Sequence, residues 1–262
     1  MRDVALVTGA GSGIGLEIVR ALFRRGVHVF GVALGQRELD DLAREARESG
    51  AQLDTLAIDL TQDGAVEQVL SHAAARGLQV RTLVNCAGIG LYGEHLSLDD
   101  AAVARMVALN IGALTELSTK LARSMVARGQ GQILNVASTA AFQPLPRLCA
   151  YSATKHYVAA FTLGLAEELR GTGVSVSLLC PGTTNTPFIQ SAGIAKGTRT
   201  NRLAQRLSMT PEDVAQAAMT ALDGPRGFVV AGRLNRAHYA LSRLLPPRAL
   251  TRAFERVTRA TG

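Results

Sequence analysis

The sequence predicts a single α/β domain built on a doubly wound parallel sheet, and two observations carry this prediction. The chain has 262 residues, 47% hydrophobic and 19% charged, which is enough for one domain to bury a large core without disulfides or metal. Short apolar or β-branched runs also alternate with longer segments whose apolar residues recur every three or four positions. Such alternation is typical of parallel strands joined by helices that cover both faces of the sheet.

Seven runs have the length and composition of strands. They span residues 4–8, 27–33, 53–58, 80–87, 131–138, 174–180 and 227–232. Helical periodicity fills the segments between them, as in "GIGLEIVRALFRR" and "RELDDLAREARES". The stretch 183–210 lacks strand character and mixes glycine with polar and apolar residues, as a loop or short helices over a binding site would. We therefore expect one domain over residues 1–232 that includes this loop.

The remaining residues, 233–262, form a basic extension with helical character. Residues 225–262 hold eight arginines against Glu255 alone, so the net charge of +7 belongs to this end of the chain. After Pro246-Pro247, apolar side chains recur at helical spacing at Leu250, Ala253, Phe254 and Val257. This pattern favours a helix packed on the domain or on another subunit. Contact with an anionic membrane surface is the less favoured alternative, and without a reading motif or interleaved aromatics we expect no nucleic-acid partner.

The chain reads as a cytoplasmic protein without a metal site. Its first strand begins almost at the N-terminus, and no apolar run reaches the roughly 18 residues of a membrane span. The cysteines, Cys86, Cys149 and Cys180, are odd in number and far apart, and the five histidines are scattered. Neither pattern is typical of a disulfide framework or a metal cluster.

Two short motifs suggest chemistry. The stretch "TGAGSGIG" (8–15) follows the first strand and opens the first helix, where free backbone N–H groups attract phosphate. Tyr151 and Lys155 stand four residues apart, so on a helix they share one face. Either motif alone decides little, because a tight turn or an ordinary helix face produces the same pattern.

The chain resembles the short-chain dehydrogenase/reductase family, in its branch of about 250 residues. The resemblance rests on the order of motifs along residues 4 to about 232 rather than on any one of them. These motifs are "TGAGSGIG", Asp59 after the third strand, "NCAG" (85–88), Asn110 in a long helix, Ser138 after the fifth strand, Tyr151 with Lys155, and "PGTTNT" (181–186). The resemblance implies a Rossmann-type fold and an NAD(P)(H)-dependent oxidoreductase that interconverts a carbonyl and a secondary alcohol.

It also implies four catalytic residues. Tyr151 is the acid/base, and its free pKa near 10 must fall by about two to three units to work near neutrality. An ammonium about 4 Å away supplies roughly 4 kcal/mol at an effective dielectric constant of about 20, so Lys155 is expected to lower that pKa and to hold the nicotinamide ribose. Ser138 is expected to bind the substrate oxygen, and Asn110 to hold a water that links Lys155 to solvent.

The cofactor contacts implied by the resemblance fall into four groups. They are Gly9, Ser12, Ile14 and Gly15 around the phosphates, Asp59 and Leu60 at the adenine, Asn85, Ala87 and Gly88 along the adenosine, and Pro181, Gly182, Thr184 and Thr186, with Tyr151 and Lys155, at the nicotinamide end. One departure is Cys86, where the family usually has a second asparagine.

The choice of cofactor depends on the end of the second strand. NAD enzymes usually place an acidic residue there and NADP enzymes a basic one, but Ala33 and Leu34 are neither. Arg37 is close enough in sequence to reach a 2′-phosphate, and the sequence suggests no carboxylate to repel it. Ser12 argues the other way, since it stands where many NADP-preferring members carry a base. We expect NADP(H) to be slightly favoured over NAD(H).

The substrate pocket is expected to be largely apolar. The segments that resemble the family's pocket walls supply Leu91, Tyr92, Phe142, Leu145, Leu148, Phe188 and Ile189, with Arg147 as their one full charge. We expect a largely apolar small-molecule ketone or alcohol. A ketoreductase acting on an acyl chain or carrier-linked substrate and a non-catalytic NAD(P)-binding regulatory or scaffold protein stay open as alternatives. The helix after Asn110 and the helix over 152–170 carry more apolar surface than one sheet face can cover, and the resemblance implies that they pair across a two-fold axis. We therefore expect a homodimer or homotetramer.

Overall fold

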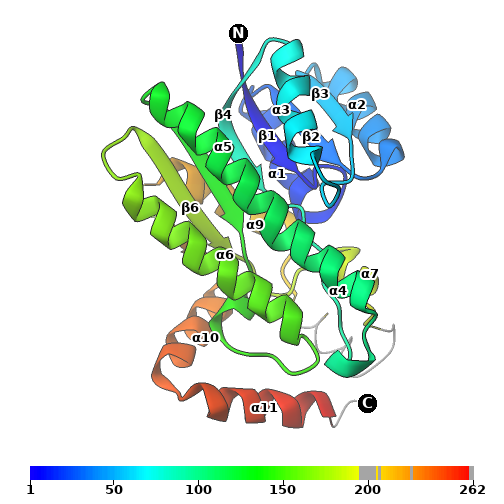
Figure 1. The fold of residues 1–262 in the computed structure, drawn as a ribbon, viewed down its shortest axis with the longest axis vertical. Coiled ribbons are helices and arrows are strands. Elements are labelled where there is room, and N and C mark those ends of the chain that lie inside the picture. The colour runs from blue at the N-terminus through cyan, green and yellow to red at the C-terminus, as the bar shows by residue number, and fades with distance from the viewer. Residues whose placement is uncertain (195–204, 206–207, 225–226, 260–262) are drawn as a thin grey trace.

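Seven parallel strands form one sheet in the order β3-β2-β1-β4-β5-β6-β7 (Figure 1). The computed structural model describes residues 1–194, 205, 208–224 and 227–259, with residues 257–259 described by backbone alone. The strands are β1 (Arg2–Thr8), β2 (Val29–Ala33), β3 (Leu53–Ala57), β4 (Leu78–Asn85), β5 (Gly131–Val136), β6 (Val174–Cys180) and β7 (Phe228–Val230). The predicted Rossmann-type sheet of about seven strands is therefore confirmed, with small differences at the strand ends.

Helices cover both faces of the sheet. One face carries α1 (Gly13–Arg24), α2 (Gln36–Ser49) and α9 (Pro211–Asp223), whose buried side chains share a core with β1 and β5. The other carries α3 (Ala65–Ala75), α5 (Leu114–Ala127) and α6 (Cys149–Glu168), packed on β4 and on the far side of β1. Because both faces are covered, the strands read as nearly continuous apolar runs rather than as alternating ones.

The strand order reverses at β1. The chain builds β1, β2 and β3 outward in one direction, then returns to place β4 on the other side of β1 and continues through β7. Connections therefore leave β1 and β4 on opposite sides, which opens a crevice beyond the carboxyl ends of these two strands. The Gly-rich turn and the "NCAG" segment both lie at this point.

A long helical stretch, Asp100–Ala127, follows the loop after β4. It consists of α4 (Asp100–Val107), a π-helical turn (Ala108–Ala113) and α5. By length and composition it could cross a membrane, a test that a core helix also passes. Here α5 buries Leu114, Leu117, Leu121 and Met125 against the rest of the chain. The π turn places Asn110 in the interior, as such turns often do at functional sites.

The chain beyond β7 is helical. It comprises α10 (Arg233–Leu244) and α11 (Pro247–Arg259), and Figure 1 shows α11 lying across the end of the molecule beneath α6 and α10. The smaller elements are the 3-10 turns His95–Ser97 and Thr139–Phe142 and the short α7 (Phe188–Ser191). Of the expected loop at 183–210, residues 195–204 and 206–207 lie outside the described residues. The division at residue 232 stays a prediction.

Candidate active site

The Gly-rich turn brings β1 and β4 into close contact. Gly9 has a φ of +71°, and a Cβ there would lie 3.0 Å from the Cα of Ala87. A Cβ on Gly15 would lie 2.1 Å from the carbonyl oxygen of Gly9, so a side chain at either position would force the turn apart. The hydroxyl of Thr8 accepts hydrogen bonds from the backbone N–H groups of Cys86 and Ala87, each at 3.1 Å. These contacts fix the turn against the segment after β4.

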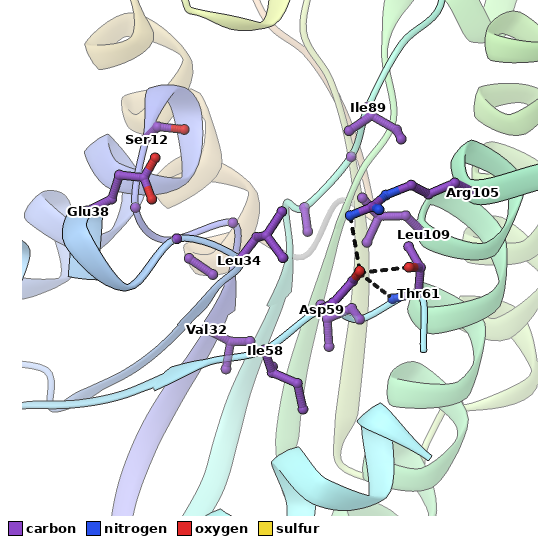
Figure 2. Close-up of a pocket in the computed structure, with 17 residues that line it drawn as sticks. Ser12, Val32, Leu34, Glu38, Ile58, Asp59, Thr61, Ile89, Arg105 and Leu109 are labelled. Carbon is purple, nitrogen blue, oxygen red and sulfur yellow. Dashed lines mark hydrogen bonds and ion pairs between the residues drawn. The ribbon is translucent and has the colours of Figure 1, made fainter. Parts of the chain in front are cut away.

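A cleft opens beside this turn, at the reversal point of the sheet (Figure 2). Six residues predicted to contact a cofactor line it: Gly9, Ser12, Asp59, Leu60, Ala87 and Gly88. Ser12 is the N-cap residue of α1 and its side chain caps no backbone group, so the N–H groups of the first turn face the cleft without a side-chain partner. The phosphates of a dinucleotide fit this end of the cleft.

Asp59 forms an ion pair that sequence reasoning missed. Its carboxylate accepts hydrogen bonds from the N–H (3.0 Å) and the hydroxyl (2.7 Å) of Thr61 and pairs with the guanidinium of Arg105 at 3.0 Å. Burial raises the pKa of Asp59, but these partners outweigh it and hold the pKa below its usual value. Arg105 lies 46 residues away in sequence, on α4, so only the fold brings it to the adenine end of the cleft.

The residue of α2 that lines the cleft is Glu38, not Arg37. The Cβ of Glu38 lies 2.8 Å from where a Cβ on Gly11 would be, and its carboxylate lies against Gly35. Figure 2 shows Glu38 and Ser12 on one side of Leu34, with Asp59 and Arg105 on the other. The expectation that no carboxylate stands near the end of β2 was therefore wrong. The expectation failed because the first turn of α2 brings Glu38, rather than Arg37, back over the glycines.

Lys155 and Tyr151 lie together on one buried face of α6. The Lys155 ammonium donates a hydrogen bond to the carbonyl of Val136 at 3.0 Å and lies 5.8 Å from the centre of the Tyr151 ring. A Cβ on Gly88 would lie 3.5 Å from the Lys155 nitrogen and 3.2 Å from the side-chain oxygen of Asn110. Lys155 and Asn110 therefore meet beside Gly88, which lines the cleft, and Tyr151 lies next to this lysine.

Asn110 holds the loop after β4 against α6. Its amide oxygen accepts a hydrogen bond from the N–H of Ile89 (3.0 Å), while its nitrogen donates to the carbonyl of Ile89 (2.9 Å) and to the hydroxyl of Thr154 (3.1 Å). Thr154 immediately precedes Lys155, so this bridge positions the lysine. The predicted water relay at Asn110 stays a prediction.

Ser138 lies next to Tyr151 at the end of β5. Its hydroxyl accepts a hydrogen bond from the N–H of Ala140 at 3.1 Å, and Ser138 is close enough to Tyr151 to lower the pKa of that tyrosine. A single oxygen atom placed near both hydroxyls could accept hydrogen bonds from each. This is the geometry that a substrate carbonyl needs.

Burial controls the protonation of this site. It raises the pKa of Tyr151 to about 12, against the opposing hydrogen bond from Ser138, and lowers the pKa of Lys155 to about 8. The expectation that Lys155 lowers the pKa of Tyr151 is not met in these surroundings, because desolvation of the phenolate is the larger effect. Burial also raises the pKa of the Cys86 and Cys180 thiols to about 12, so both are neutral packing groups.

Of the other predicted cofactor residues, some lie near the Gly-rich turn and others are packed away from the cleft. The side chain of Thr186 lies 3.2 Å from a Cβ built on Gly13, across the Gly-rich turn, while Gly182 lies beneath the side chain of Asn235. Ile14 packs against the core. Asn85 does not line the cleft: its amide donates hydrogen bonds to Ser118 and Asn135, both at 2.9 Å, in a buried network below it.

The remaining sequence-predicted residues lie close to these. The carbonyl of Pro181 accepts a hydrogen bond from the N–H of Thr139 at 2.8 Å, and the buried Thr184 donates to the carbonyl of Gly182 at 3.1 Å. The N–H of Tyr92 donates to the carbonyl of Ala192 at 2.8 Å.

An apolar cluster surrounds Tyr151. Its buried members are Met106, Ala140, Leu145 and Tyr151, with Ile89, Leu91, Leu148, Ala150, Phe188 and Phe254 packed against them. The ring centres of Phe188 and Tyr151 are 5.5 Å apart. Phe142 belongs elsewhere, since its ring packs on Phe228 at 6.4 Å and on Tyr239 at 4.6 Å. The sequence placed Phe254 on the apolar stripe of a C-terminal helix but did not point to it as a residue of this site.

Comparison with known proteins agrees with this geometry. Residues 3–196 match the family model described as short chain dehydrogenase. A Streptomyces coelicolor protein described as a ketoacyl reductase is 37% identical over 191 residues, covering 72% of this chain and 73% of that protein. The chain belongs to the short-chain dehydrogenase/reductase family. It is an oxidoreductase that acts on CH–OH or C=O groups with NAD(P).

Two solved structures extend the likeness over most of the chain. A short-chain dehydrogenase from Sphingobium yanoikuyae in complex with NADPH has a TM-score of 0.80 at 28% identity, with 94% of this chain and 97% of that one covered. A short-chain dehydrogenase/reductase from Burkholderia phymatum in complex with NAD has a TM-score of 0.82 at 25% identity, with 92% of each chain covered.

The depressed pKa of Lys155 predicts a pH dependence. The lysine loses its charge as pH rises through about 8, while Tyr151 stays protonated up to about 12. If the reaction needs the Lys155 ammonium, kcat/KM for carbonyl reduction falls above pH 8. Steady-state kinetics at saturating cofactor from pH 6 to 10 measures this. Lys155→Arg stays charged over this range, so its kcat/KM should be lower than that of wild type but should not fall above pH 8. A wild-type kcat/KM that does not change with pH would contradict the prediction.

Proposed function

We propose that the protein reduces the carbonyl group of a largely apolar small molecule, with Tyr151 as the proton donor. The observation that carries this proposal is the Tyr151 side chain, which is buried beside Ser138 inside an apolar cluster. A pKa of about 12 keeps that hydroxyl protonated at neutral pH, which suits a general acid better than a general base.

The residues divide the work between them. Ser138 and Tyr151 donate hydrogen bonds to the substrate oxygen and hold it in place, and Tyr151 then gives up its proton to that oxygen. The charged form of Lys155 stabilises the phenolate that remains, and Asn110 positions this lysine through Thr154 and Ile89. When bound along the cleft from Ser12 to Lys155, a nicotinamide dinucleotide supplies the hydride.

The substrate class follows from the cluster around Tyr151. Leu91, Leu145, Leu148 and Phe188 leave few partners for a polyhydroxylated compound, and burying unpaired hydroxyls costs several kcal/mol, so an apolar ketone fits better. A 3-oxoacyl chain is the second candidate, since the Streptomyces coelicolor relative is described as a ketoacyl reductase. Arg147, which pairs with Glu94 at 3.9 Å, is a cation that a carrier phosphate could reach.

The cofactor preference is proposed from Glu38. Neighbouring structures hold NADPH or NAD, which supports either cofactor. The NADP(H) preference expected from Arg37 loses its main support, because Glu38 lines the cleft in its place. A carboxylate beside the glycines repels a 2′-phosphate and accepts hydrogen bonds from a 2′-hydroxyl. We therefore propose NAD(H) as the favoured cofactor.

Removal of the Tyr151 hydroxyl tests the proposed reaction. Tyr151→Phe should lower kcat for ketone reduction at least ~100-fold while cofactor affinity stays within a few-fold, because only the proton donor is lost. Following nicotinamide absorbance with apolar and polyhydroxylated carbonyl compounds measures both the reaction and the substrate class. Tyr157→Phe removes a hydroxyl from the same helix that contacts Thr115 rather than Ser138, and it should stay within twofold of wild type. Near-normal turnover by Tyr151→Phe would remove Tyr151 from the mechanism.

Neutralising Glu38 tests the cofactor proposal. Glu38→Gln should raise the ratio of kcat/KM for NADPH to that for NADH by about tenfold, the effect of relieving roughly 1.4 kcal/mol of repulsion. Asp41→Asn removes the same charge from the same helix outside the cleft and should change the ratio less than twofold. An unchanged ratio in Glu38→Gln would show that the carboxylate does not face the 2′ position.

We propose a homodimer or homotetramer in the cytoplasm. Family membership and three free cysteines support a cytoplasmic location. The helices α5 and α6 lie side by side, joined by Thr115 and Tyr157, whose hydroxyls are 3.1 Å apart (Figure 1). Four exposed apolar residues accompany them: Val107, Val126, Tyr157 and Leu163. Such a face is typical of a two-fold interface.

Light scattering at micromolar concentration tests this assembly. Wild type should be at least dimeric, and Leu163→Glu should shift the mass toward the monomer because it places a charge in the apolar face. Leu96→Glu, at a fully exposed site on another surface, serves as the control and should leave the mass unchanged. A monomeric wild type would contradict the proposal.

A further inference from the structure

The C-terminal helix α11 lies against the apolar cluster that holds Tyr151. The family match ends at residue 196, so this helix is a feature of the chain outside the matched region. We propose that α11 forms one wall of the substrate pocket and that Phe254 determines how large a carbonyl compound can lie beside Tyr151. The inference rests on the proposed function, since it takes the cluster around Tyr151 as the place where substrate binds.

Helix α10 carries the chain from the sheet to this position. The Tyr239 ring packs between Phe142 and Phe228, with ring centres 4.6 and 5.0 Å away. His238 makes a hydrogen bond with the Gln143 side chain at 3.3 Å. Phe142 and Gln143 belong to the segment that links Ser138 to α6. Helices α10 and α11 together form a C-terminal arm. The start of this arm is therefore fixed to the same segment that carries Ser138.

Helix α11 then contacts the next part of that segment. The Thr251 hydroxyl donates to the carbonyl of Pro247 within α11 at 2.8 Å and also lies 3.5 Å from the carbonyl of Pro144. Phe254, one turn further on, packs against the cluster. Residues three apart share a helix face, so Thr251 and Phe254 point the same way. Because the Thr251 proton is directed at Pro247, the 3.5 Å approach to Pro144 contributes little, and burial of the Phe254 ring is the larger contribution to this contact.

Phe254 differs from the other residues around Tyr151 in how it is held. A Cβ on Gly90 would lie 2.6 Å from the Phe188 ring, so Phe188 is wedged between Gly90 and Tyr151. Leu145 and Leu148 are fixed by the turn that leads into α6. Phe254 approaches from a separate arm, so a change in its side chain alters the width of the pocket without disturbing the hydroxyls of Ser138 and Tyr151.

The opposite side of α11 provides matched controls. Arg248, Arg252 and Arg256 are exposed, so substitutions there change the helix surface without changing what faces the cluster. Arg252 lies two residues from Phe254, and Arg252→Ala tests whether any truncation in this helix has the same effect.

Kinetics on a graded series of aryl alkyl ketones tests the inference. Phe254→Ala should raise the ratio of kcat/KM for the largest ketone to that for the smallest at least tenfold, and Phe254→Trp should lower it. Cofactor dissociation constants should stay within twofold, and Arg252→Ala should keep the wild-type ratio. If both Phe254 variants are folded and active and keep the wild-type size preference, the inference is wrong. Should Phe254→Ala fail to fold, Phe254→Trp decides.

A second readout separates this inference from the proposed function. Amide hydrogen exchange of residues 145–151 should be faster in Phe254→Ala than in wild type or Arg252→Ala, because the ring shields the cluster. This measurement needs no substrate. Absence of ketone turnover in wild type would defeat the proposed function, whereas unchanged exchange in Phe254→Ala would defeat the placement of α11.

Discussion

The close approach of β1 and β4 at the reversal of the sheet is the constraint on which the site depends. Gly9 passes so near Ala87 that a side chain has no room, and the Thr8 hydroxyl holds the backbone of Cys86 and Ala87. This junction fixes the start of α1 relative to the loop after β4. The phosphate end of the cleft and the Gly88 end near Lys155 are thus parts of one rigid arrangement.

The catalytic centre combines strong burial with an ionisable pair. Burial shifts both Tyr151 and Lys155 toward their neutral forms. The Lys155 ammonium donates a hydrogen bond to the carbonyl of Val136 at the end of β5, and Ser138, just beyond that strand, opposes the rise in the Tyr151 pKa. Both pKa shifts come from burial, and shifts of this size in neighbouring groups are typical of functional sites. Groups that enter the cleft change this balance, since they alter both solvation and charge around the pair.

We assign selectivity for the cofactor and for the substrate to residues outside the family's motifs. Glu38 comes from the first turn of α2, Arg105 from α4, and Phe254 from the C-terminal arm. Each lies on an element whose own sequence resembles an ordinary amphipathic helix. In our proposals the motif residues perform the chemistry, while these three helices shape what is bound at the adenosine end and at the substrate end.

The sequence by itself determined the parallel seven-stranded sheet and placed Asn110, Ser138, Tyr151 and Lys155 in one site. It could do so because hydrophobic periodicity is local and the motifs stand at fixed places relative to the strands. It also pointed to Gly9, Ser12, Asp59 and Gly88 in the cleft, and these positions follow directly from the strand ends.

Tertiary structure alone decided which side chains face the cleft from a distance. Arg37 and Glu38 are neighbours in sequence, but only Glu38 lies over the glycines and lines the cleft. Asn85 lies below the cleft rather than in it, and Phe142 packs away from Tyr151, contrary to prediction. Packing between helices and strands selects these partners, and no local pattern in the sequence indicates them. The raised pKa of Tyr151 likewise depends on burial by residues that are far apart in sequence, among them Ile89, Met106 and Phe188. Long-range packing of this kind leaves no signal in the spacing of the sequence.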